Sequence, residues 1–295
     1  MLNLRQKIKN LPFIGTIAKK LADFDREYRG LIKDQIYYLK ARKFLFKNAK
    51  IENSLSDKKV FVIACGPSIK NQDLSQIGNH PCITVSNFFV HQDFSKLNVV
   101  FHVFAASHTP ILDEQIIAWW KDAAKHFKKG QNVFVALTDK YLIDRENLFA
   151  DQNVFYYKIN YKKDISPRRK IDFTRHIPTI KTVAHIAMYL GIFTGSKDLN
   201  LVGFDHDWIL HVGKSMHFYE EKQSAMVVAG YNENTKTVIN EDFEAVLNSN
   251  IGLWKTYKKI KVYTDAFNIK VTNVTPGSLL DVFPRRKLED VLNQN

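Results

Sequence analysis

Short apolar runs, each closed by small or polar residues, constrain the fold of this chain more than any other feature. The clearest is the run at 60–64, VFVIA, which is followed at once by Cys65-Gly66-Pro67-Ser68. A β-branched run of this length is typical of a strand buried on both faces of a parallel sheet. Similar runs lie at 82–85, 99–104, 132–136, 154–157, 199–202, 261–263 and 271–274.

Helix-length segments separate these runs, including one around Trp119-Trp120 and one at 178–193. Alternation of strands and helices is typical of a doubly wound sheet. We therefore predict an α/β, Rossmann-like fold with a doubly wound, mainly parallel sheet. A chain of 295 residues is long enough for one such domain with an appendage. Its two cysteines, Cys65 and Cys82, favour a reducing compartment.

The net charge of +13 is concentrated at the N-terminus. The first 50 residues hold 13 basic and four acidic side chains, whereas the rest of the chain is nearly balanced. Apolar positions over 17–48 recur roughly at helical spacing, and no run is long enough for a signal peptide or a membrane span. We predict a basic helical segment at 1–55 that binds an anionic membrane surface or packs on protein, followed by a main domain at 56–295. We expect no binding to nucleic acid, because the main domain carries little net charge.

Polar residues follow several of the predicted strands. Ser68, Asn87 and Asp205 each come directly after one, as do Ser107 and His108. Ligands of an open parallel sheet bind outside the carboxyl ends of its strands. The sequence therefore predicts a ligand site at this edge of the sheet.

The turn Gly66-Pro67-Ser68 fits a phosphate site in that position. Glycine allows a close backbone approach, and exposed N–H groups of such a turn bind anions. The turn is neither a GxGxxG motif nor a Walker A loop. Thr179, which we expect at the start of a helix, supplies a second anion-binding group. We expect Gly66, Ser68, Asn87, Thr179 and Asp205 to lie near one another.

A long polar excursion follows Asp205, and we predict a lid at about 206–245. It contains His206, His211 and His217. Histidine is the usual general base near neutral pH, so a lid histidine is a candidate catalytic residue. The spacing of five and six residues matches no zinc signature, and we predict no metal site, although a zinc arrangement with Asp205 is an alternative.

Several of these segments together resemble a known family. The segment at 60–70, VFVIACGPSIK, resembles the start of the small bacterial sialyltransferases that use CMP-sialic acid. Their other motifs resemble the segments at 84–89, 179–191, 199–205 and 254–263. The same segments, and the ending at 273–285, also resemble the broader group with a 6-hydroxymethylpterin-pyrophosphokinase-like domain, which includes flagellin-glycosylation accessory proteins.

The resemblance implies a metal-independent transferase with a Rossmann-like core and no cofactor. It implies a nucleotide site with these residues: Gly66, Pro67, Ser68, Asn87, Thr179, Ile180 and Asp205. The family's catalytic histidine lies in a lid after the strand that ends near Asp205, so His217 and His211 are the candidate bases, with His217 preferred for its aromatic neighbours. Cys65 and Asp207 depart from the family pattern, which has Asn and Tyr there.

The sequence therefore favours a glycosyltransferase that uses a nucleotide-activated sugar, CMP-linked in the simplest case, in bacterial surface glycan biosynthesis. Its expected partners are a nucleotide-sugar donor, a glycan or lipid-linked acceptor, and an anionic membrane surface bound through residues 1–50. Its expected location is cytoplasmic, peripheral on the inner face of the bacterial inner membrane. The alternatives are a pterin-type pyrophosphokinase-like enzyme that uses ATP and magnesium, and a non-catalytic glycan-pathway scaffold.

Overall fold

The computed structural model describes residues 41–108, 111–210, 231–232, 237–238 and 243–294. The chain divides into two units, Met1–Lys43 and Phe44–Asn295, and the second contains the sheet. Among the described residues, no helix is long and apolar enough to cross a bilayer. The predicted division at residue 55 remains a prediction, as does the membrane role of the basic segment.

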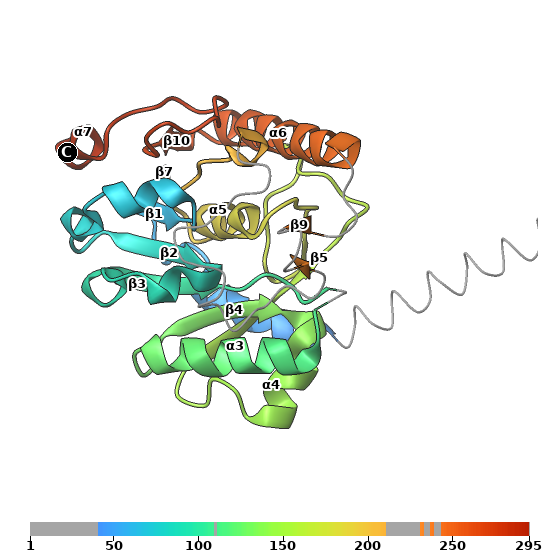
Figure 1. Cartoon of the computed structure of the whole chain (residues 1–295). Coiled ribbons are helices and arrows are strands. Elements are labelled where there is room, and N and C mark those ends of the chain that lie inside the picture. The colour runs from blue at the N-terminus through green and yellow to red at the C-terminus, as the bar shows by residue number, and fades with distance from the viewer. Residues whose placement is uncertain (1–40, 109–110, 211–230, 233–236, 239–242, 295) are drawn as a thin grey trace, which may run out of the picture. The chain divides into compact units, whose positions relative to one another are not determined.

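One eight-stranded sheet organises the second unit (Figure 1). Its strands lie in the order β10-β7-β1-β2-β3-β4-β5-β6, and every pairing between neighbours is parallel. Their bounds are β1 Lys59–Ile63, β2 Pro81–Val85, β3 Asn98–Val103, β4 Asn132–Ala136, β5 Asn153–Ile159, β6 His176–Ile177, β7 Asp198–Val202 and β10 Lys270–Asn273. The predicted α/β, Rossmann-like fold with a parallel sheet is confirmed.

Helices and short 3-10 helices connect these strands. The helices are α3 Asp113–His126, α4 Lys140–Glu146, α5 Val183–Phe193, α6 Phe243–Ala266 and α7 Leu288–Leu292. The 3-10 helices are η1 Phe46–Ile51, η2 Pro67–Asn71, η3 Leu74–Ile77, η4 Ser86–Val90, η5 Phe94–Lys96, η6 Leu137–Asp139 and η7 Trp208–Leu210. A separate antiparallel pair consists of β8 Tyr231–Asn232 and β9 Thr237–Val238.

Helix α5 packs on β1, β2 and β3 and is buried on almost all sides. Its apolar residues occur all round the helix, as expected for a helix in a domain core. Gly191 allows this close packing, because a Cβ there would lie 2.8 Å from a methyl carbon of Leu199 on β7. Helix α6 packs on the outer strand β10.

The predicted strand at 261–263 is wrong, because these residues belong to α6. The triplet Lys-Val-Tyr has local β propensity, but Tyr257, Ile260 and Tyr263 are buried at helical spacing. Val262, between the buried positions, is exposed. Burial of one face of a long helix outweighs the local preference of three residues.

Residues just before β1 pack on the sheet. The amide nitrogen of Asn48 donates to the carbonyl oxygens of Tyr156 and Phe173, at 2.8 and 2.7 Å, and the side chain is fully buried. The backbone N–H of Leu55 donates to the carbonyl of Thr194 at 2.7 Å. Residues 44–55, the last part of the predicted basic segment, are therefore held against the sheet.

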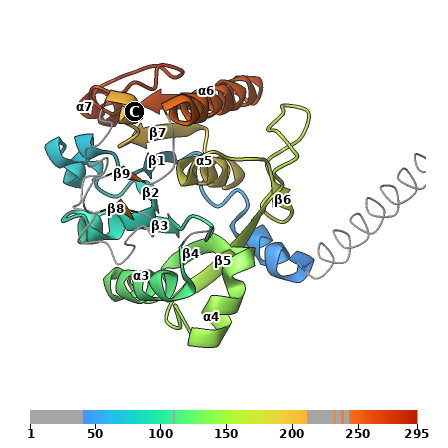
Figure 2. The same cartoon turned by 45° about the vertical axis from the view of Figure 1, so that its right-hand side comes forward.

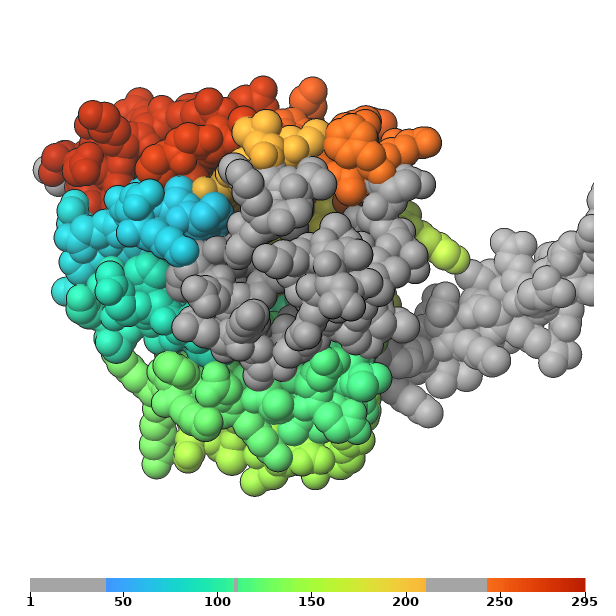
Figure 3. All heavy atoms as spheres, in the orientation of Figure 1, coloured from blue at the N-terminus to red at the C-terminus, as the bar shows by residue number. Residues whose placement is uncertain are grey.

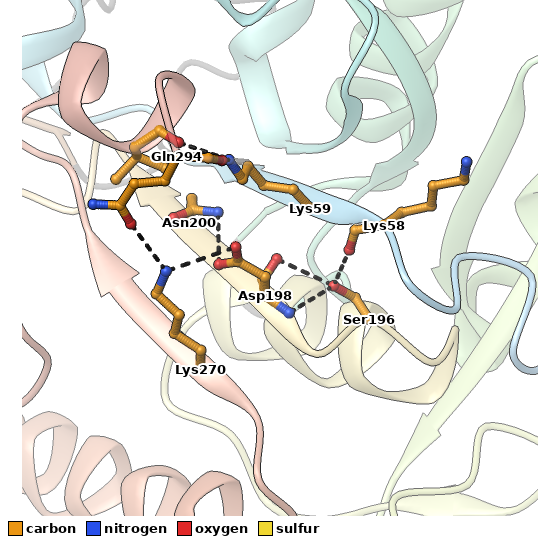
Figure 4. Close-up of polar contacts among 8 residues, drawn as sticks. Lys58, Lys59, Ser196, Asp198, Asn200, Lys270 and Gln294 are labelled. Atoms are coloured by element: carbon orange, nitrogen blue, oxygen red, sulfur yellow. Dashed lines mark hydrogen bonds and ion pairs between the residues drawn. The ribbon is translucent and has the colours of Figure 1, made fainter.

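A polar network fixes the amino ends of β1, β7 and β10 (Figure 4). The hydroxyl of Ser196 donates to the carbonyl of Lys58 at 2.8 Å, and the Asp198 carboxylate lies 3.8 Å from Nζ of Lys270. Nζ of Lys59 donates to the carbonyls of Val291 and Gln294 near the C-terminus. These contacts hold β7 in register between β1 and β10. They involve only the amino ends of the three strands, so the residues at the carboxyl ends take no part in this network.

Candidate functional site

The chain reverses its direction of winding between β1 and β7. From β1 it proceeds outward through β2 to β6, and it then returns to place β7 on the other side of β1. Strands β1 and β7 run in parallel register, with Ile63 beside Val202. In open α/β sheets the crevice outside such a switch point is where ligands bind. The residues that follow Ile63 and Val202 are therefore the first candidates for a site.

Ser68 and Asp205 meet at this switch point. The backbone N–H of Ser68 donates to Oδ1 of Asp205 and its hydroxyl donates to Oδ2, both at 2.9 Å. The Asp205 carboxyl is only 6% exposed. Burial raises its pKa above the usual range, and the two bonds from Ser68 act in the opposite direction. The predicted proximity of Ser68 and Asp205 is confirmed.

Gly66 makes room for this pair. Its N–H donates to the carbonyl of Gly203 at 3.0 Å. A Cβ on residue 66 would lie 1.8 Å from Oδ2 of Asp205 and 2.5 Å from that carbonyl oxygen. Only glycine fits here without displacing the carboxylate. Pro67 then begins η2.

Cys65 and Asn87 connect β1 to its other neighbour, β2. The thiol of Cys65 donates to the carbonyl of Val85 at 3.3 Å. Burial raises the pKa of this thiol to about 12, although N–H groups of Asn87 and Phe88 favour its ionised form. The Asn87 side chain is buried, and its Oδ1 accepts a hydrogen bond from the indole of Trp119 on α3. Asn87 therefore lies in η4, just after the neighbouring strand β2, and its side-chain carbonyl accepts a hydrogen bond from the core.

Thr179 and Ile180 differ from their predicted setting. Helix α5 begins at Val183, and Thr182 is its N-cap, with a side chain that accepts from the N–H of Ala184. The predicted helix start at Thr179 is wrong, because 176–177 pairs with β5 as strand β6 and the following Pro178 keeps the chain extended. The N–H of Thr179 donates to the carbonyl of Lys163 at 2.7 Å, and its own carbonyl accepts from the Tyr189 hydroxyl. Both Thr179 and Ile180 are half-buried.

A buried group of His185, His206 and Tyr257 links Asp205 to α5. His206 follows Asp205 directly, and its Nε2 forms a 2.7 Å hydrogen bond with the Tyr257 hydroxyl. The ring of His185 on α5 lies 4.4 Å from the Tyr257 ring, centroid to centroid. Residues 207–210, which follow this group, lie beside α6 at the surface (Figure 3).

Both histidines are neutral near pH 7. Burial lowers the pKa of His206 to about 4, and the Asp207 carboxylate opposes this only in part. Burial also lowers the pKa of His185 well below its usual value. Among the described residues, Nδ1 of His206 and Nε2 of His185 have no hydrogen-bond partner. The sequence singled out His206 only as one of three lid histidines and did not indicate His185 or Tyr257.

A second serine–aspartate pair follows β3 and β4. The N–H and hydroxyl of Ser107 donate to the Asp139 carboxylate at 2.8 and 2.6 Å. Asp139 is almost fully buried. Asp139 was not among the predicted site residues, and its position three residues after the apolar run at 132–136 is the signal that could have identified it. The two pairs are chemically alike, but only Ser68–Asp205 lies at the switch point.

The two predicted bases, His211 and His217, lie outside the described residues, as does most of the predicted lid. Within the part of the chain that the structure describes, no group of three or more histidine, cysteine or carboxylate side chains is arranged to hold a metal ion.

No protein family model matches the chain, and no curated protein matches it. Solved sialyltransferases from Campylobacter jejuni resemble it. CstII in complex with cytidine-5'-monophosphate is 16% identical, over 81% of this chain and 88% of that one, with a TM-score of 0.46. CstII with a trisaccharide acceptor and CMP is 17% identical, over 81% and 89%, with a TM-score of 0.45.

The monofunctional alpha-2,3-sialyltransferase Cst-I is 17% identical, over 81% of this chain and 83% of that one, with a TM-score of 0.44. Similarity at this level carries no argument about activity. The fold follows from the strand order, and the site follows from the residues at the switch point.

Proposed function

We propose that this protein is a glycosyltransferase that binds a nucleotide-activated sugar at the β1–β7 switch point. The observation that carries the proposal is the Ser68–Asp205 pair, which fixes the Gly66-Pro67-Ser68 turn at the place where an open parallel sheet binds ligands. The segment at 60–70 resembles a motif of sialyltransferases that use CMP-sialic acid, so we propose a CMP-linked donor.

The proposed reaction transfers the sugar to an acceptor hydroxyl. The bond between the anomeric carbon and the phosphate oxygen breaks, CMP leaves with the electron pair, and the acceptor oxygen forms the new bond. The acceptor proton passes to a general base, for which we propose His217, with His211 second. The leaving phosphate needs hydrogen-bond donors. The N–H groups of Gly66 and Ser68 already donate within the protein, so the hydroxyl of the half-buried Thr179 is our candidate for this role.

The same proposal includes a biological setting. We propose a role in bacterial surface glycan biosynthesis, with a glycan or lipid-linked acceptor and no requirement for a metal ion. The basic segment at 1–50 would hold the enzyme at the inner face of the inner membrane, where anionic lipids attract lysine and arginine. Deletion of residues 1–40, which leaves Phe46 and the buried Asn48 in place, should lower binding to anionic vesicles.

One observation bears on the pyrophosphokinase alternative. That enzyme needs carboxylates that bind magnesium, and Asp205 with Asp207 is the candidate pair. Both oxygens of Asp205 already accept hydrogen bonds from Ser68, and this favours a structural role for the carboxylate. A strict dependence on magnesium and ATP would nevertheless establish the kinase and reject the transferase.

Nucleotide binding with a matched pair of variants tests the proposed site. We expect calorimetry in EDTA to show tighter binding of CMP than of UMP, GMP or ATP. Ser68→Ala removes one bond to Asp205 and should weaken CMP binding about fivefold. Ser107→Ala removes the equivalent bond to Asp139 and should leave CMP affinity unchanged. Equal losses in both variants would reject the switch point as the nucleotide site.

The base is tested by transfer from a CMP-linked sugar to an identified acceptor. His217→Ala should lower turnover by roughly 10²–10⁴-fold, with little change in CMP affinity. His211→Ala and His206→Ala are the comparisons. Full activity in His217→Ala with loss in His211→Ala would reassign the base, and binding of CMP without any turnover would favour the scaffold alternative.

A further inference from the structure

Positive charge is also concentrated outside the N-terminal segment, in the connection between β5 and α5 at residues 160–182. It holds seven basic side chains against two acidic ones. All seven are exposed: Lys162, Lys163, Arg168, Arg169, Lys170, Arg175 and Lys181. We call residues 160–182 the basic loop.

The backbone of the basic loop is fixed by buried contacts. Ile165, Ile171 and Phe173 are buried, and the N–H of Ile171 donates to the Tyr263 hydroxyl on α6 at 2.9 Å. The carbonyl of Phe173 accepts from Asn48 in η1. Because apolar anchors alternate with the basic positions, the charges are displayed from an ordered surface.

Few of these charges are neutralised within the protein. Asp172 pairs with Arg175 at 3.3 Å, and Asp164 pairs at 2.6 Å with Lys259, a further cation from α6. Among the described residues, no acidic side chain pairs with Lys162, Lys163, Arg168, Arg169 or Lys170. A cluster of five unpaired cations is repulsive by itself, and an external anionic partner would stabilise it.

Exposed aromatic side chains accompany the charge. Tyr161 at the start of the loop is 69% exposed, and Phe46 on η1 is 62% exposed. Figure 2 shows η1 and the basic loop on the same side of the body. Lysine and arginine bind anionic headgroups, whereas aromatic rings enter the interfacial region of a bilayer. The phenyl ring of Phe46 has no polar group, so burial in that region removes apolar surface from water.

We infer that the basic loop, together with Phe46, is a docking face for an anionic lipid bilayer. It is formed by the folded body and is distinct from the segment at 1–40, and it does not depend on the proposed donor chemistry. Thr179 and Ile180 belong to the same loop, so docking through it would bring the bilayer close to residues of the candidate nucleotide site. An acceptor held in the membrane would then reach the enzyme by diffusion along the bilayer surface.

The test uses the full chain and two fourfold variants of equal charge. The loop variant is K162Q/R168Q/R169Q/K170Q, and the control, K128Q/K129Q/R286Q/K287Q, removes exposed charges from other parts of the body. Partition onto phosphatidylcholine vesicles with about 30% phosphatidylserine is measured by co-sedimentation. We expect partition of the loop variant to fall about tenfold or more, and that of the control less than about twofold.

A variant that keeps the net charge tests the contribution of the Phe46 ring to bilayer binding. Phe46→Ala should lower partition roughly threefold to tenfold and leave its salt dependence unchanged. Unchanged partition in the loop variant, or equal losses in loop variant and control, would overturn the inference. So would RNA that binds the full chain more tightly than the vesicles do and displaces them. Failure of CMP to bind would bear on the proposed function and not on this face.

Discussion

Ser68 holds both oxygens of the Asp205 carboxylate, one through its backbone N–H and one through its hydroxyl, across 137 residues of sequence. The pair joins the turn after β1 to the turn after β7, and β1 and β7 are the two strands on either side of the switch point. The conformation of the Gly66-Pro67-Ser68 turn therefore depends on a residue from a distant part of the chain.

Replacement of this carboxylate should impair both stability and binding. In Asp205→Asn the hydroxyl of Ser68 must turn from donor to acceptor, and both bonds to the charged carboxylate become weaker bonds to a neutral amide. We expect the free energy of unfolding to fall by about 1–3 kcal/mol and CMP binding to weaken. Urea denaturation and calorimetry measure the two effects. Asp139→Asn is the matched control and should lower stability while CMP affinity is retained.

Gly66→Ala tests the close approach of backbone to carboxylate. The added methyl group would lie 1.8 Å from Oδ2 of Asp205, so the turn or the carboxylate must move. We expect a loss of about 1–3 kcal/mol in the free energy of unfolding, and loss of CMP binding. Gly252→Ala in α6 is the control, since its nearest neighbour is the flexible end of Lys181 at 3.4 Å, and alanine favours a helix. Wild-type stability in Gly66→Ala would contradict the described turn.

His206 should make the protein sensitive to mild acid. Its pKa is about 4 in the folded state and 6.5 when unperturbed, so unfolding takes up a proton between these values. The free energy of unfolding should therefore fall as pH drops from 6.5 to 4, by roughly 3 kcal/mol from this group. In His206→Gln the fall should be shallower, as measured by urea denaturation across that range. The exposed His108→Gln should match the wild type, and an unchanged slope in His206→Gln would place the ring in water.

Cys65 should be unreactive in the folded protein. Burial raises the pKa of its thiol to about 12, and the other cysteine, Cys82, is buried with a similarly raised pKa. Thiolates and not thiols react with disulfide reagents. We expect no rapid labelling by such a reagent at pH 7.5 and labelling of both cysteines after denaturation. Fast labelling of Cys65 in the native state would show that the turn after β1 is open to solvent.

The sequence was sufficient for most of the sheet because most residues of its strands are buried. Runs such as 60–64 and 199–202 carry little but apolar side chains, and that composition identifies a buried parallel strand. The sequence-based prediction failed at 261–263, where packing of α6 on distant parts of the chain outweighs local β propensity. It also failed at β6, which has only two residues and forms a strand because β5 supplies its partner.

The candidate site was predicted in part. Ser68 and Asp205 were expected to meet because both follow strands, and a rule of sheet topology brings strand ends together. The start of α5 was misplaced because Pro178 can begin a helix as well as end a strand, and only the pairing of 176–177 with β5 decides between them. His185 and Tyr257 could not be identified, since nothing local in α5 or α6 indicates that their rings meet.

The position of β7 between β1 and β10 has a consequence for synthesis on the ribosome. A growing chain carries Gly66 and Ser68 from early on, but Asp205 emerges 137 residues after Ser68. Until β7 has been made, β1 can pair only with β2, and its other edge offers unpaired backbone groups to any neighbouring chain. Long-range pairing of this kind is slow and exposes aggregation-prone surface. A nascent chain stopped before Asp198 therefore cannot form the proposed nucleotide site. The free edge of β1 is the part of such a chain where chaperone binding would do most to prevent aggregation.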